Sequence, residues 1–146
     1  MQSKGYTVGV VKSTSKDVQQ PDGTDTGTFH DAGSEFSVLL GPTTTTVSYS
    51  RRVDIREILR GVETDFVFVE GAKKSNIPKI WCVGTCDTET RDLPENVKAI
   101  VYWKEYEREC RDAFESLDIP IYTSVDIASI AEVIINEAVA LNDVEL

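Results

Sequence analysis

The sequence predicts an α/β fold with a mostly parallel sheet flanked by helices. Short, densely apolar runs alternate along the chain with segments whose apolar residues recur at helical spacing, a pattern typical of strands covered on both faces. The clearest run is Asp65–Gly71, in which four β-branched or aromatic residues lie between an acid and Glu70. Ligands of open α/β sheets bind at the carboxyl ends of the strands, so Glu70 is the first candidate site residue.

In the first part of the chain, β-branched residues predict a strand over Tyr6–Val11 that ends at Lys12. The polar stretch Ser13–Thr28 predicts a long loop, a feature that in compact domains is usually functional or disordered. If the first strand runs as the others do, this loop leaves the sheet at the edge that carries Glu70. A short helix over Thr28–Ala32 should end at Gly33, because glycine adopts the left-handed conformation that terminates helices.

Residues 36–60 predict a hairpin and a short helix. Phe36–Leu40 and Thr45–Tyr49 are rich in strand-forming residues, and the short Gly41-Pro42 link favours an antiparallel pair. The hairpin at 36–49 is uncharged and is therefore a candidate dimer edge. Asp54 can cap a helix over Ile55–Arg60.

Three more strands and two helices complete the pattern. Apolar runs predict the strands Lys79–Val83, Val97–Tyr102 and Ile119–Tyr122. Glu105–Leu117 is a charged segment with apolar residues on one helical face, and residues 127–138 repeat Ile and Ala at helical spacing, with Ser124 or Asp126 as the cap. By length, residues 1–146 form a single domain.

Composition limits the function classes. A net charge of -10, from 25 acids and 15 bases, argues against nucleic acid or an anionic membrane surface as a partner. The sequence shows neither a signal segment nor an apolar run of membrane-spanning length, which predicts a cytoplasmic protein. Three sparse cysteines, Cys82, Cys86 and Cys110, are typical of reduced thiols. The single histidine, His30, is expected on the surface and argues against a Ser-His-Asp or Cys-His hydrolase.

Two further groups are expected near Glu70. Asp22 and Asp25 lie in the polar loop, and carboxylates that converge from two strand ends suit Mg²⁺. The alternative for them is a Pro-Asp-Gly turn with a capping aspartate. Lys12 ends the first strand at the same edge and could meet a phosphate; an exposed strand-end lysine is the alternative.

Several stretches, in order, resemble the molybdopterin-guanine dinucleotide biosynthesis protein B family, P-loop proteins that bind GTP. The matching residues are Gly5–Lys12, Asp17, Pro21–Thr26, Asp31–Ser34, Asp65–Lys73, Ile77–Ile80, Ile119–Tyr122 and Val125–Ile127. The resemblance implies a P-loop-like fold and an accessory protein of molybdenum cofactor biosynthesis. Such a protein helps a guanylyltransferase attach GMP to molybdopterin and forms a homodimer.

The resemblance also implies roles for single residues. Glu70 and Asp25 would hold Mg²⁺, and the nucleotide or cofactor contacts would be Lys12, Asp22, Asp25 and Lys73. Lys73 is included among these contacts because it matches a basic position of the family. The alternative is that its charge is simply solvated. No catalytic residue is assigned, and the activity implied is at most that of a weak GTPase. The alternative function is a non-catalytic cofactor- or partner-binding module that has lost the nucleotide.

The sequence departs from the family at its start. The family opens with a strand, a glycine-rich loop ending in Gly-Lys-Thr and a helix, whereas these residues begin where that helix should finish. The missing unit would supply the backbone N–H cradle, the phosphate-binding lysine and the Mg²⁺-ligating hydroxyl. Its strand is central in such folds, so its neighbours should have unpaired edges. Three explanations stay open: a start further upstream, a partner chain that supplies the unit, or a sheet that closed around a lost nucleotide site.

Smaller departures follow. Ser13–Lys16 stand where the family has a His-rich run, and Thr24 replaces a lysine, although Asp25 is kept. Val101–Trp103 replaces a pattern of small residues and Asp.

Overall fold

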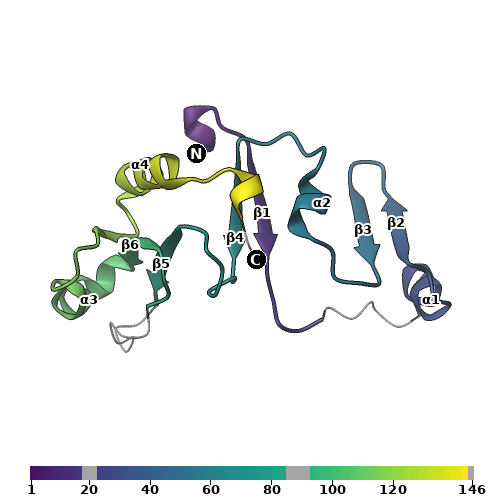
Figure 1. Ribbon diagram of the computed structural model, residues 1–146, viewed down its shortest axis with the longest axis horizontal. Helices are drawn as coiled ribbons and strands as arrows, with labels where there is room; N and C mark the ends of the chain where they lie inside the picture. The colour runs from purple at the N-terminus through teal and green to yellow at the C-terminus, as the bar shows by residue number, and fades with distance from the viewer. Residues whose placement is uncertain (18–22, 85–92, 145–146) are drawn as a thin grey trace. The chain divides into compact units, whose positions relative to one another are not determined.

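The computed structural model describes residues 1–17, 23–84 and 93–144. The chain divides into two compact units (Figure 1). One consists of Met1–Ser13 together with Thr64–Leu146, and the other is Thr14–Glu63. The prediction of a single domain stays a prediction.

The first unit begins with a parallel pair of strands, β1 (Val8–Lys12) and β4 (Phe66–Glu70). Their register places Lys12 opposite Glu70, so both residues stand at the carboxyl end of the pair. The amino-terminal residues contain a short 3₁₀ turn over Gln2–Lys4. The strand predicted over Tyr6–Val11 begins two residues later, because the residues before it make side-chain contacts instead.

The contacts before β1 hold the amino end of the strand pair. The Thr7 N–H and hydroxyl both donate to Asp65 Oδ2 at 2.7 Å, and the Asp65 N–H donates to the Thr7 hydroxyl at 2.9 Å. The Tyr6 and Phe66 rings pack edge to face, with centroids 5.1 Å apart. The hydrogen bonds from the Thr7 backbone and hydroxyl lower the pKa of Asp65 below its ordinary value of 3.8.

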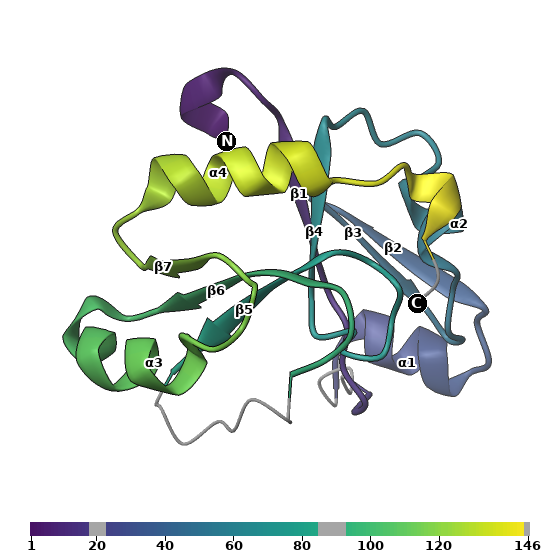
Figure 2. The ribbon, with the colours of Figure 1, turned by 60° about the vertical axis from the view of Figure 1, so that its left-hand side comes forward.

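The same unit contains a second, three-stranded parallel sheet in the order β5–β6–β7. Its strands are β5 (Lys79–Val83), β6 (Val97–Tyr102) and β7 (Ile121–Thr123). Helix α3 (Glu107–Phe114) and helix α4 (Ile127–Glu137) lie on opposite sides of this sheet, as Figure 2 shows. The helices were predicted with slightly longer bounds.

The core follows from the period of two along β6. Ile100 and Tyr102 point to one face and pack with Val83 and with Cys110 and Phe114 of α3. On the other face, α4 contacts β6, where Ala99 is also fully buried. Cys82 is a free, exposed cysteine, whereas Cys110 is disulfide-bonded. The expectation of reduced thiols is therefore wrong at Cys110, and Cys86 lies outside the described residues.

The predicted α/β class, with parallel strands flanked by helices, is confirmed, but the parallel strands form two sheets. Among the described strands, β4 pairs only with β1 and β5 pairs only with β6. Each of these two strands therefore has one edge without a described partner. Densely apolar runs such as those of β4 and β5 predict strands well, but they carry no information on which strands pair.

The second unit contains helix α1 (Asp25–Asp31), strands β2 (Phe36–Leu40) and β3 (Thr45–Tyr49), and helix α2 (Ile55–Leu59). The predicted antiparallel hairpin is confirmed, in a register that places Val38 opposite Val47. The Asp54 carboxylate caps α2, as predicted, by accepting from the Arg56 N–H at 2.8 Å. Gly33 has a φ of 89° just after α1, which confirms its terminating role.

Replacing Asp65 with Asn should weaken the Thr7–Asp65 contact and destabilise the first unit. Because the folded-state pKa of Asp65 lies below 3.8, its contribution is fully present above that pH and is lost as the pH falls toward the folded value. Chemical denaturation at pH 7 should therefore give a lower midpoint for Asp65→Asn. That difference from the wild type should shrink as the pH falls below about 4. An equally wide gap at pH 7 and at pH 2 would contradict this.

Candidate functional site

The candidate site is the carboxyl edge of the β1–β4 pair, where two predicted residues meet. Lys12 Nζ lies 2.8 Å from Glu70 Oε1, an ion pair with the geometry of a charge-assisted hydrogen bond. Both side chains are open to solvent, at 68% and 66% exposure. The pair follows from the register, because equivalent strand ends of a parallel pair stand side by side. The other Glu70 carboxylate oxygen makes no described hydrogen bond.

The chain leaves this edge through a turn that requires glycine. Gly71 has a φ of 93° and the next residue, Ala72, a φ of 47°. A Cβ on Gly71 would collide with the Ser13 carbonyl oxygen, and the Ser13 N–H donates to the Glu70 carbonyl at 2.8 Å. The first residue after β1 is therefore packed tightly against the first residue after β4. This close approach fixes the backbone on both sides of the Lys12–Glu70 pair.

The Lys73 side chain contacts an aromatic ring of strand β5. Its ammonium lies 4.8 Å from the centroid of the Trp81 ring, a cation–π contact. The structure thus gives Lys73 an aromatic partner that the sequence did not suggest. Its role toward a cofactor stays a prediction.

Asp25 lies in helix α1 and not in a loop, so that part of the prediction is wrong. The helix begins three residues earlier than expected, because the Thr24 hydroxyl accepts from the Gly27 N–H at 3.1 Å and acts as the N-cap. Asp25 is the acid of the first turn, where it complements the helix dipole. Asp25 belongs to the Thr14–Glu63 unit and Glu70 to the other, so their joint role stays a prediction. Asp22 lies outside the described residues.

The structure describes one further residue that the sequence analysis considered, His30. His30 is exposed on α1, as expected, and its Nδ1 lies 3.7 Å from Asp31 Oδ1. Within residues 1–17, 23–84 and 93–144, no three His, Cys, Asp or Glu side chains gather as a metal site would require. No helix in these ranges is long and apolar enough to cross a membrane.

Sequence reasoning missed a second strand-end cluster, at the carboxyl ends of β6 and β7. Asp126 Oδ2 accepts from the Thr123 hydroxyl and N–H, both at 2.7 Å, and these bonds lower the pKa of Asp126. Asp126 was predicted as the cap of the last helix and stands at that position, but its side chain makes no capping bond. The sequence did contain a sign of this cluster. In Thr-Ser-Val-Asp at the end of a predicted strand, the aspartate is spaced to accept hydrogen bonds from the threonine three residues before it.

With this geometry in view, comparisons with known proteins identify the family. The family model for molybdopterin guanine dinucleotide synthesis protein B, MobB, matches residues 1–103. The chain belongs to the MobB family. No curated protein matches it significantly. The predicted family is thereby confirmed, and with it a place in molybdopterin guanine dinucleotide synthesis.

Solved MobB structures share the fold. The structure of Bacillus subtilis MobB is similar with a TM-score of 0.63 and 21% identity, over 95% of this chain and 83% of that one. A MobB protein homolog from Bacillus stearothermophilus has a TM-score of 0.60 and 20% identity, over 93% and 80% of the two chains. At these identities the likeness concerns the α/β fold alone.

Gly71→Ala should destabilise the protein more than Gly61→Ala. Both glycines have positive φ, but a Cβ on Gly61 meets nothing within 4 Å, whereas one on Gly71 meets the Ser13 backbone. Gly61→Ala should cost about 1 kcal/mol for the left-handed conformation alone, and Gly71→Ala about 3 kcal/mol or more. Urea denaturation of the two variants measures both. Equal losses would show that Ser13 yields easily, and would contradict the tight approach.

Proposed function

We propose that this MobB-family chain is an accessory GTP-binding protein that assists the guanylyltransferase attaching GMP to molybdopterin. The observation that best supports this proposal is the Lys12–Glu70 pair at the carboxyl edge of two parallel strands. Such an edge would offer a carboxylate to Mg²⁺ and a neighbouring ammonium to a phosphate. Family membership supplies the guanine nucleotide and the molybdopterin partner as the chemistry to test.

The residues present fit a magnesium nucleotide. Glu70 is 66% exposed and uses one oxygen for Lys12, which leaves the other to accept from a magnesium-bound water. Bound Mg²⁺ would neutralise phosphate charge. Lys12 would then turn from Glu70 to a phosphate oxygen. Asp25 would be the second carboxylate, and Asp22 and Lys73 would contact the nucleotide or the pterin.

The proposed activity is weak GTP hydrolysis at most. The 146 residues contain no Gly-x-x-x-x-Gly-Lys-Ser/Thr pattern, so the backbone cradle that positions phosphates is not among them. The second candidate function is a non-catalytic module that binds a cofactor or partner without nucleotide. We place the protein in the cytoplasm, with neither nucleic acid nor membrane as a partner. The Cys110 disulfide is unusual for that compartment.

Isothermal titration calorimetry of the purified chain with GTP and Mg²⁺ separates the two functions. Micromolar binding of GTP, with ATP much weaker, supports the nucleotide function. Glu70→Gln should then lower the affinity about tenfold in Mg²⁺ and little in EDTA, because it removes only the metal ligand. Lys12→Gln should lower it in both. Glu63→Gln, a surface acid outside the site, should bind as the wild type does. Absence of binding at millimolar GTP would favour the module.

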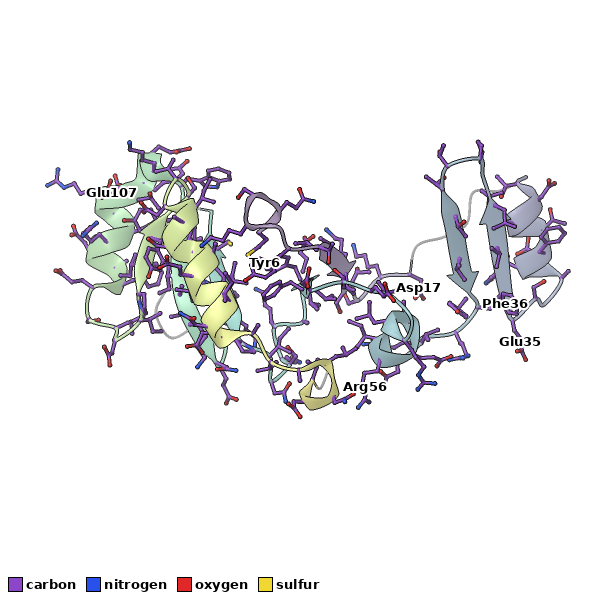
Figure 3. All side chains as sticks on the ribbon, turned by 90° about the horizontal axis from the view of Figure 1, so that it is seen from above. Tyr6, Asp17, Glu35, Phe36, Arg56 and Glu107 are labelled. Carbon is purple, nitrogen blue, oxygen red and sulfur yellow. The ribbon has the colours of Figure 1, made fainter. Side chains whose placement is uncertain are left out.

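The proposed homodimer uses one face of the hairpin. Alternation along the strands places Phe36, Val38 and Leu40 on the same face as Val47 and Tyr49. These five apolar side chains are between 44% and 77% exposed. Phe36 is labelled on β2 in Figure 3, and its ring centroid lies 6.3 Å from that of Tyr49. An isolated two-stranded hairpin is marginally stable in water, so this face gains from a partner.

Val38→Lys should convert the dimer to a monomer in sedimentation velocity, because it places a charge at the centre of that face. Leu39→Lys is the matched control. It lies on the opposite face of the same strand and is also exposed, at 60%, so the dimer should persist. An unchanged mass for Val38→Lys would exclude this face. A monomeric wild type would exclude the homodimer.

A further inference from the structure

The carboxyl ends of β6 and β7 border a cavity of about 310 Å³. Tyr102 and Thr123 are register partners at these strand ends, and the Ser124 N–H donates to the Tyr102 carbonyl at 2.7 Å. The two loops that follow therefore run side by side. Such a strand-end position is where open α/β sheets bind ligands. The cavity lining shares no residue with the Lys12–Glu70 pair.

Both carboxylates of the lining are already engaged. Glu107, at the start of α3 (Figure 3), accepts from Arg111 Nη2 at 3.1 Å, one helical turn further on. Asp126 accepts twice from Thr123. One oxygen of each carboxylate is thus already engaged within the protein.

The donors of the lining are only partly engaged. Lys104 has neither a hydrogen bond nor an ion pair among the described residues, although its charge helps to lower the pKa of Asp126. The hydroxyl of Tyr102, a residue only 1% exposed, has no hydrogen-bond partner in that part of the chain. The hydroxyl nevertheless lies close enough to Arg111 for the two side chains to interact, and this interaction, ahead of the one with Glu107, raises the pKa of that guanidinium. Arg111 also has more N–H groups than its bond to Glu107 uses. A buried donor without an acceptor is unfavourable, so a ligand that accepts from these groups would be stabilised.

We propose that this cavity binds a small organic anion, a phosphate ester or a carboxylate. Its charged group would lie between Lys104 and Arg111, and its apolar part against Ile121 and Val125, which also line the cavity. A volume of about 310 Å³ corresponds to roughly ten water molecules in the liquid, and so to a ligand of roughly ten non-hydrogen atoms. Charges further away than about 8 Å are screened at physiological salt, so the lining itself, with two cations and two carboxylates, matters more here than the net charge of -10.

The test titrates the ¹⁵N-labelled chain with three probes of matching size, phenyl phosphate, benzoate and neutral benzamide, and follows amide resonances. At least one of the two anions should shift the resonances of residues 102–111 and 121–126, and benzamide should not. Arg111→Gln should weaken that binding at least tenfold. Arg108→Gln is the matched control, because it removes an arginine from the same helix that does not line the cavity.

Tyr102→Phe provides a second variant. It deletes a buried hydroxyl that has no acceptor, although it interacts with Arg111, so the thermal midpoint should change little while the anion binds several-fold more weakly. The stronger of phenyl phosphate and benzoate identifies the anionic group. Binding of benzamide as tight as that of both anions, or equal affinities of Arg111→Gln and Arg108→Gln, would overturn the proposal. Glu70→Gln should bind the probes as the wild type does, whatever calorimetry with GTP shows. Loss of probe binding in that variant would contradict the claim that the cavity and the Lys12–Glu70 pair are separate sites.

Discussion

The parallel pairing of β1 with β4 is the constraint on which the candidate site depends. A contact stands at each end of the pair, and each joins residues 58 positions apart: Thr7 with Asp65 and Lys12 with Glu70. A two-stranded sheet gains little stability by itself, so the hydrogen bonds of Thr7 with Asp65 matter more here than they would in a large sheet. A slip of one residue would separate both pairs and would also turn the apolar side chains to the wrong faces.

The pairing also closes a loop around the Thr14–Glu63 unit, whose ends are the continuation of β1 and the approach to β4. Closing a loop of that length is entropically unfavourable, and local contacts must compensate for it. The Gly71–Ser13 approach stands at this junction. The residues that shape the candidate site are therefore also the residues that hold the two ends of the loop together. A substitution there should be judged on stability before it is judged on binding.

Much of the fold could be predicted from the sequence, because the signals are local. Strands β2, β3, β5 and β6 begin and end as predicted, since β-branched runs and turn residues mark them. What the sequence could not give depends on pairing in space. The split into two parallel sheets, the Lys73–Trp81 contact and the disulfide at Cys110 join residues whose local sequence carries no sign of a partner. Helix α1 begins earlier than predicted because the sequence analysis did not recognise Thr24 as its N-cap.

The candidate site residues also divide into those that the sequence could predict and those that it could not. Lys12 and Glu70 were predictable because both end strands of a parallel pair, and a shared edge follows from topology alone. Lys104 and Arg111 were not, because one lies in a turn and the other on a helix, and only packing brings them to one cavity. Asp25 shows the limit of loop reasoning. A polar stretch that reads as a loop can begin a helix wherever a threonine hydroxyl accepts from the backbone.

The exposure of the Lys12–Glu70 pair suits a ligand site better than a structural one. Exposed ion pairs typically contribute about 0–1 kcal/mol, so parting these two side chains costs little. A buried pair would resist a ligand, because separating it leaves a charge without a partner in a poorly solvated place. In the resting protein Lys12 offsets the charge of Glu70, which would otherwise repel a phosphate. In the proposed function, a ligand that carries its own cation would take over both partners at once, with Glu70 turning to the metal and Lys12 to the phosphate. The tight turn at Gly71 keeps the two strand ends in place while the side chains exchange partners. Rigid backbone and weakly held side chains are what an exchange of this kind requires.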